Sequence, residues 1–146
     1  SVTALGNNNF VIASAYDDVN SVVNAGSVML VSGTSGAQIG TTIAGIIEDD
    51  SLGKSSVTAL GNNNFVIASR YDDGSDFFGR NIVNAGSIRQ IDTTGTQVGI
   101  IMGAATNDMS RISVTDASAH NFYVVSLRRF DNNSMTDSGF ATVVAY

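Results

Sequence analysis

The 146-residue chain contains no cysteine and no proline, and only 14% of its residues are charged. Without cysteine, the chain has no disulfide framework, no thiol nucleophile and no cysteine-based metal site. Without proline, its turns must be formed by glycine, asparagine, aspartate and serine. Low charge together with 43% hydrophobic residues excludes a disordered chain or a coiled coil, because both need more charge and less burial.

Basic residues are also few, since 7 Lys and Arg stand against 13 Asp and Glu and leave a formal net charge of −6. A negative chain repels phosphate backbones and anionic lipids, so we expect neither nucleic-acid binding nor insertion into a membrane. No apolar run approaches the roughly 20 residues that a membrane span requires. The chain opens with Ser1 rather than methionine, from which we expect a processed form or a piece of a longer protein.

What the chain does contain is an internal repeat. Residues 1–14 read SVTALGNNNFVIAS, and residues 56–69 carry the same letters. The motif Val-Asn-Ala-Gly-Ser at 23–27 returns at 83–87. A weaker third copy begins at Ser113 and continues through residues 121–126, whose Asn-Phe start matches residues 64–65. A period of about 55 residues is typical of propeller and solenoid arrays. The predicted repeats span residues 1–55, 56–112 and 113–146, the last of them degenerate and incomplete.

Each repeat contains four strand signals separated by turns rich in Gly, Asn and Asp. Residues 65–69, Phe-Val-Ile-Ala-Ser, are apolar on both faces, which indicates a strand buried between two sheets. Helical periodicity is absent. Four antiparallel strands in about 55 residues match one blade of a β-propeller, so the sequence predicts an all-β fold of tandem four-stranded antiparallel blades. In the second copy the expected strands lie at 56–60, 65–69, 85–91 and 97–102.

Three motifs carry a family resemblance: Leu52-Gly53 ahead of the repeat, Tyr71-Asp72-Asp73 after its second strand, and Ala85-Gly86-Ser87-Ile88 at its third. With them the repeat resembles the FG-GAP repeats of integrin-α-type β-propellers, and more closely the related repeats of large bacterial haemagglutinin-like and adhesin-like surface proteins. The resemblance implies propeller blades and an extracellular or cell-surface location. The family's Asp-rich calcium loop between the first two strands is replaced here by Gly61-Asn62-Asn63-Asn64, which lacks carboxylates.

A blade cannot bury its two faces alone, and propellers typically close with about four to eight blades. The chain supplies about three, and the last one lacks the signal for its fourth strand. We therefore expect closure either by oligomerisation or within a longer parent chain. A contact between copies that fails to close would instead produce a filament.

Acidic residues gather in the loops that follow the second strands. Calcium is the cofactor that such hard oxygen ligands suggest. The alternative is that these aspartates start turns and solvate the loops, since their spacing fits no EF-hand loop. The candidate metal ligands are Asp17, Asp18, Asp72, Asp73 and Asp76, and Glu48, Asp49 and Asp50 form a further acidic cluster with the same two interpretations.

A second candidate site lies in the longer of these loops, which carries arginine and aromatic residues together. Such a combination is typical of recognition surfaces and suits stacking on a sugar or contact with a surface protein. The alternative is a loop that packs its own phenylalanines against the edge of the sheet. The candidate ligand-binding residues are Arg70, Tyr71, Phe77, Phe78 and Arg80.

Identical copies build the same surface twice, whereas catalysis needs an asymmetric set of positioned groups. The sequence therefore predicts a non-catalytic structural or adhesive repeat module of a secreted or cell-surface protein, which acts through self-assembly and multivalent contacts. One alternative is a lectin-like propeller that binds a carbohydrate or a protein through the loops after its second strands. Another is a fragment of a secreted propeller enzyme that acts on polysaccharides.

Overall fold

The computed structural model describes residues 1–75, 78–117, 121–128 and 139–145. Every regular element in these ranges is a β-strand, so they hold no helix that is long and apolar enough to cross a membrane. All strand pairs are antiparallel. The prediction of an all-β, antiparallel fold is confirmed.

The first sheet contains four strands in the order β1-β2-β3-β4, which is also their order in the chain. A tight turn joins its first two strands: Asn8 adopts a positive φ of 64°, and the Asn7 side chain accepts a hydrogen bond from the Asn9 N–H at 3.2 Å. Asparagine tolerates this backbone conformation better than most residues, so the Gly-Asn-Asn-Asn motif forms the turn. The strands are β1 (Val2–Ala4), β2 (Phe10–Ser14), β3 (Ser27–Val31) and β4 (Gln38–Ala44).

The second sheet has the same arrangement, because its order β10-β9-β6-β5 is again a simple meander. Asn63 repeats the positive φ of the first turn, at 66°. The extra residues of the longer loop form a short hairpin, β7 (Gly74–Ser75) with β8 (Asn81–Ile82), between the second and third strands of the sheet. The main strands are β5 (Ser56–Ala59), β6 (Phe65–Ser69), β9 (Ser87–Ile91) and β10 (Gln97–Met102).

The third sheet contains β11 (Ile112–Ala117), β12 (Phe122–Leu127) and β13 (Phe140–Ala145). Its register corrects the alignment of Phe122 with Phe65 that the Asn-Phe motif suggests. Val114 matches Val57 in the repeat; Val57 pairs with Ile67, and Val114 pairs with Val125. Val125 therefore occupies the position of Ile67, and Tyr123, two residues earlier, occupies that of Phe65. A shift of one residue moves every side chain to the other face of a strand, and this shift buries Tyr123 and Val125 in the core.

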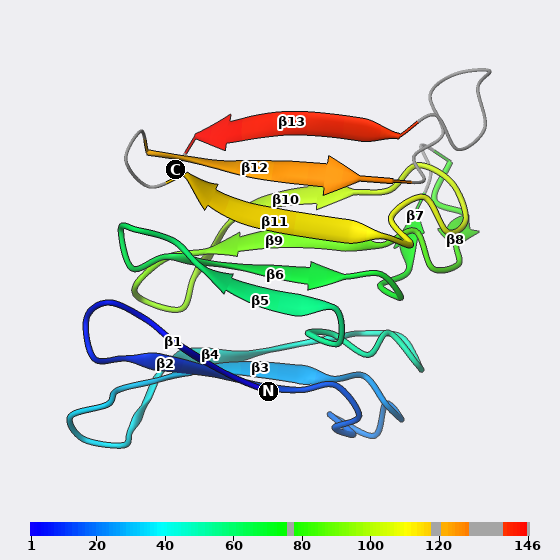
Figure 1. Ribbon diagram of the computed structural model, residues 1–146. Coiled ribbons are helices and arrows are strands. Elements are labelled where there is room, and N and C mark those ends of the chain that lie inside the picture. Colours follow the sequence, from blue (N-terminus) through cyan, green and yellow to red (C-terminus); the bar gives the residue numbers. More distant parts are fainter. Residues whose placement is uncertain (76–77, 118–120, 129–138, 146) are drawn as a thin grey trace.

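The three sheets lie in layers, one above the other (Figure 1). One apolar cluster joins the first two sheets and contains Val11, Leu30 and Phe65; a second cluster joins the last two and contains Val66, Ile88 and Tyr123. The middle strand β6 is buried along its whole length. The prediction that residues 65–69 are covered on both faces is therefore confirmed.

Candidate functional site

The loops after β2 and β6 leave the same end of the stack, at the right in Figure 1. Each begins with Tyr-Asp-Asp, at Tyr16 in the first copy and at Tyr71 in the second. Because the strands before them have the same sequence and the same position in their sheets, the two tyrosines extend from equivalent points. The segment between β4 and β5 places Lys54 between the two.

Lys54 lies against both tyrosine rings. Its Nζ is 4.8 Å from the ring centroid of Tyr16 and 4.4 Å from that of Tyr71. The guanidinium carbon of Arg70 lies 4.5 Å from the centroid of Tyr71. Cations at these distances are attracted to aromatic faces, by about 0.5–1 kcal/mol at exposed sites. We call Tyr16, Lys54, Arg70 and Tyr71 the tyrosine–lysine cluster.

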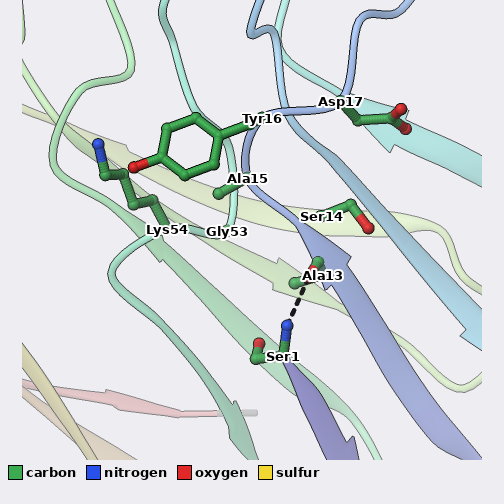
Figure 2. A pocket seen from close by; sticks show the side chains of 8 residues that line it. All are labelled: Ser1, Ala13, Ser14, Ala15, Tyr16, Asp17, Gly53 and Lys54. Atoms are coloured by element: carbon green, nitrogen blue, oxygen red, sulfur yellow. Dashed lines mark hydrogen bonds between the residues drawn. The ribbon is translucent and has the colours of Figure 1, made fainter.

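Two depressions flank this cluster, and Tyr16 and Lys54 line both of them. The larger has a volume of about 570 Å³. It lies beside Ala13 and Ser14 of β2 (Figure 2). The smaller has a volume of about 340 Å³ and reaches Tyr71 and Asn84 in the loop after β6. Tyr16 is 66% exposed, so its ring is available to a ligand or a partner. The larger depression is lined by Ser1, Ala13, Ser14, Ala15, Tyr16, Asp17, Gly53 and Lys54.

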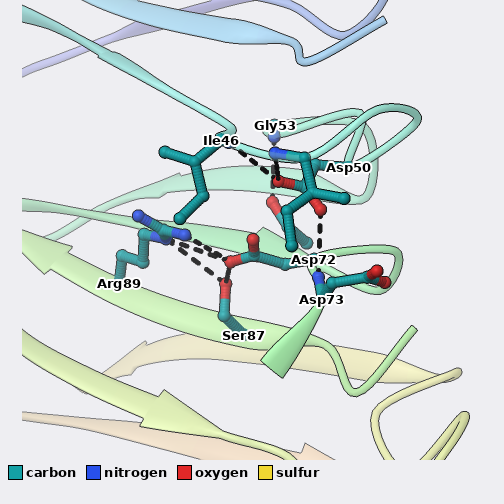
Figure 3. A network of polar contacts seen from close by, with 9 residues as sticks. Ile46, Asp50, Gly53, Asp72, Asp73, Ser87 and Arg89 are labelled. Carbon is teal, nitrogen blue, oxygen red and sulfur yellow. Dashed lines mark hydrogen bonds and ion pairs between the residues drawn. The ribbon is translucent and has the colours of Figure 1, made fainter. Parts of the chain in front are cut away.

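The first aspartate of each Asp-Asp pair binds a serine at the start of the third strand. Asp17 Oδ2 accepts a hydrogen bond from Ser27 Oγ at 2.6 Å, and Asp72 Oδ2 accepts one from Ser87 Oγ. In the second copy Arg89 adds an ion pair, with Nη2 2.6 Å from Asp72 Oδ2 (Figure 3). These bonds tie the loop to the strand that follows it.

The second aspartate of each pair binds the backbone of an asparagine in the same loop. Asp18 Oδ1 accepts a hydrogen bond from Asn24 N at 2.8 Å, and Asp73 Oδ1 accepts one from Asn84 N at 2.7 Å. Within the described residues, no three Asp, Glu or His side chains gather closely enough to hold a metal ion. Asp76 lies outside those residues, and the calcium site stays a prediction.

Asp50 belongs to the acidic cluster Glu48-Asp49-Asp50, and it joins the two copies. Its Oδ2 accepts hydrogen bonds from Ile46 N and Ile47 N, each at 2.9 Å, and its Oδ1 accepts one from Asp73 N at 3.0 Å (Figure 3). Burial raises the pKa of Asp50 above its ordinary value of 3.8, against the lowering effect of these backbone hydrogen bonds. Its carboxylate therefore positions one loop of each copy.

Asp108 makes the corresponding turn contacts after the fourth strand of the second copy. Its Oδ2 accepts hydrogen bonds from Ala104 N at 2.7 Å and Ala105 N at 2.9 Å. Both aspartates stand five positions after a glycine, Gly45 in the first copy and Gly103 in the second. That shared spacing is the sequence signal that would have identified the pair.

Arg89 and Asp72 line a further cavity of about 370 Å³, whose apolar wall includes Ile46, Ile100 and Met102. Asp72 is 1% exposed, and its Oδ1 makes no hydrogen bond with the residues that the structure describes. A buried carboxylate oxygen without a donor is costly, so this oxygen is suited to accept a hydrogen bond from water or from a small donor. Met29 replaces Arg89 in the first copy, which therefore lacks the ion pair.

The structure divides the predicted ligand-binding residues into two contacts. Arg70 lies over Tyr71 in the tyrosine–lysine cluster, while Arg80 lies 5.5 Å from the ring centroid of Phe78, which belongs to the β7–β8 hairpin segment and is 77% exposed. Phe77 lies outside the described residues. Sequence reasoning missed Tyr16 and Lys54, although the repeat of Tyr-Asp-Asp pointed to Tyr16.

Comparison with protein families finds no matching family model, and comparison with curated proteins finds no matching sequence.

Proposed function

We propose that this chain is a non-catalytic structural repeat module of a secreted or cell-surface protein, which acts through self-assembly and multivalent contacts. The observation that carries the proposal is the equivalence of the first two sheets. They share a strand order, a turn geometry and the hydrogen bonds of their Asp-Asp loops. Repeated, rigid surfaces suit scaffolding, because each copy offers the same contact again.

In this proposal each sheet is one blade of an FG-GAP-like propeller. Two features support it: the first two sheets are four-stranded antiparallel meanders, and they pack face to face through apolar side chains. The segment after β4 leads to β5, so the last edge strand of one sheet is followed by the first edge strand of the next, which is compatible with the succession of blades in a propeller. Further blades would come from other copies or from a longer parent chain.

Light scattering coupled to size-exclusion chromatography tests the assembly of the chain. We expect a molar mass above that of a single chain, which increases with protein concentration. Far-UV circular dichroism of the same fractions reports whether the material is folded and rich in β-structure. A folded chain that stays monomeric over the whole concentration range would count against self-assembly.

The tyrosine–lysine cluster favours a second function, recognition of a carbohydrate or a surface protein. Sugars stack on tyrosine faces, and the cations beside Tyr16 and Tyr71 suit a ligand that carries negative charge. A glycan array probed with the whole chain tests this function. We expect Tyr16→Ala and Tyr71→Ala to abolish binding, whereas Val98→Ala, which changes an exposed apolar residue of β10, retains it.

Phe78→Ala separates the two predicted parts of the ligand site. Loss of binding in this variant alone would assign recognition to the β7–β8 hairpin rather than to the cluster. If neither tyrosine variant nor Phe78→Ala changes binding while the fold is intact, the loops after the second strands are not the binding site.

A further inference from the structure

The second strand of each sheet carries a valine and a small residue on one face, and an aromatic and a β-branched residue on the other. In the first sheet Val11 and Ala13 point toward the second sheet, where they share one apolar cluster with Phe65 and Ile67. A valine and a small residue therefore pack against an aromatic and a β-branched residue. All four side chains are almost fully buried.

The contact between the second and third sheets repeats this pairing. Val66 shares an apolar cluster with Tyr123 and Val125 of β12. Ala68, on the same face of β6 as Val66, is also buried. The corrected register makes Tyr123 and Val125 the equivalents of Phe65 and Ile67, so the same kinds of side chain meet at both interfaces.

Among the residues that the structure describes, the stack leaves one face of each kind uncovered, at opposite ends. On the first sheet the free face carries Phe10 and Ile12, which match Phe65 and Ile67 letter for letter but are only partly buried. Val2, opposite Ile12, is 69% exposed. Side chains that are fully covered in the second copy thus have no covering sheet in the first, within the part of the chain that the structure describes.

On the third sheet the free face carries Val124 and Ser126, which occupy the positions of Val66 and Ala68. Val143 pairs with Val124 and is 60% exposed, and Phe122 on the same face is 40% exposed. Neither free face carries a charged residue on the paired positions of its strands, and Arg111 and Arg128 flank the third-sheet face beside Ser113 and Ser126. The centre of each face, around Ile12 and Val124, is therefore suited to close contact with another sheet.

We propose that the free face of the first sheet is the docking site for a second copy of this chain, which covers it with the free face of its third sheet. The inference rests on the self-assembly proposed above and identifies the two faces that would be in contact. Val124 and Ser126 of one copy would contact Phe10 and Ile12 of the next. Within one chain, Val11 and Ala13 contact Phe65 and Ile67 in the same way. This contact is head-to-tail, so it closes into a ring or extends into a filament.

Charge placed on the docking face tests the proposal. In Ile12→Lys the new ammonium is hydrated in a single chain and would be buried in the assembly, where an unpaired charge is strongly unfavourable. We expect the molar mass from light scattering to fall to that of one chain. Ile46→Lys is the matched control, because Ile46 is 78% exposed and lies on neither free face. It should assemble as the unmodified chain does.

Cross-linking tests the orientation, and the absence of cysteine from the chain leaves introduced thiols as the only targets. Within one chain Thr3 Oγ1 donates a hydrogen bond to the carbonyl oxygen of Val57 at 3.3 Å, which places these two strands in contact. Across two copies the equivalent pair is Thr115 and Val2. A mixture of Val2→Cys and Thr115→Cys chains, treated with a short bismaleimide, should give a cross-linked dimer.

Thr34→Cys replaces Val2→Cys in the control mixture, since Thr34 is an exposed turn residue, and this mixture should stay uncross-linked. Cross-linking of Val2→Cys with itself would show two first sheets face to face and would overturn the head-to-tail contact. If the unmodified chain assembles but Ile12→Lys also assembles and the mixed pair does not cross-link, the docking site is wrong while self-assembly stands. A monomeric unmodified chain would overturn both.

Discussion

Single carboxylates organise the loop end of this molecule. Asp17 and Asp72 each hold a serine of the next strand, and Asp50 and Asp108 each accept two backbone N–H groups that follow a fourth strand. These N–H groups would otherwise lack partners at a turn that the core partly covers. The aspartates therefore recur because the same backbone groups recur.

Asp50→Asn should lower the free energy of unfolding by about 1–3 kcal/mol, since an amide keeps one acceptor oxygen and turns an NH₂ group toward backbone donors. Asp50 bonds three N–H groups through both oxygens, so one of them must lose its acceptor. Urea denaturation followed by circular dichroism measures the change. Glu48→Gln, at an exposed position two residues earlier, should leave stability unchanged. Equal stability of the two variants would contradict this role of Asp50.

Tyr123 should make the fold sensitive to alkaline pH. Burial raises the pKa of its phenol above the ordinary value of 10.0, so the folded chain holds this proton more tightly than the unfolded chain does. The stability due to this difference is present below pH 10 and is lost as the pH rises through the folded pKa. Between neutral and strongly alkaline pH, the unfolding temperature of Tyr123→Phe should fall less than that of the unmodified chain. Thermal unfolding measured along a pH series gives both curves. If the stability of both proteins falls equally with pH, Tyr123 is not the source of the alkaline sensitivity.

At the scale of elements, the connections between strands depend on glycine where the backbone passes close to another segment. Gly26 and Gly86 have positive φ values of 74° and 81°. A Cβ at Gly26 would collide with the backbone of Leu52, and a Cβ at Gly86 would collide with Met109. Leu52 and Met109 are both fully buried. The N–H of Leu52 donates to the carbonyl oxygen of Ala25, and that of Met109 donates to the carbonyl oxygen of Ala85. Met109 thus fills the place of Leu52 despite the change of residue.

Phe65 and Phe10 occupy the same position in identical strands and should differ sharply in their effect on stability. Phe65 is 0% exposed between two sheets, so Phe65→Ala should cost about 3–5 kcal/mol through lost contacts and a cavity. Phe10 lies on the free face of the first sheet, and Phe10→Ala should cost clearly less in dilute solution. Denaturant unfolding of both variants gives the comparison. Equal losses in the monomer would mean that the first sheet is covered in some other way.

At the scale of the whole molecule, the second sheet is the only one that the stack covers on both faces, as the described residues show in Figure 1. Apolar burial is the main favourable term in folding, so stability should be highest in this middle layer. In the described residues, the outer sheets each leave one face open to solvent or to a partner. Their contribution to stability should therefore increase when the chain assembles.

Amide hydrogen exchange should resolve these layers. In dilute solution we expect the slowest exchange in β6 and β9 and faster exchange in β1 and β13, which are edge strands of the outer sheets. Raising the protein concentration should slow exchange in β2 and β12, the central strands of the two proposed contact faces. Uniform exchange across all three sheets would show that the stack opens as one unit and would contradict the layered order.

Much of the local structure follows from the sequence. The strands predicted at 65–69 and 97–102 agree with β6 and β10, because alternating or continuous apolar residues bounded by Gly, Asn and Thr define both ends. The alignment of Phe122 with Phe65 failed for a specific reason. It followed the Asn-Phe letters, whereas burial of the larger apolar set decides which face of a strand points inward.

The sequence by itself determined the all-β class, the repeat, the turns and most strand ends, since these depend on residues close together in the chain. Only the tertiary structure decided which faces are covered, where Tyr16, Lys54 and Tyr71 meet, and that Asp50 joins the two copies. Those features depend on contacts between residues that are far apart in the chain, such as Thr3 with Val57. Identical strands therefore acquire different surroundings, and the two uncovered faces come from the stacking of sheets rather than from any local motif.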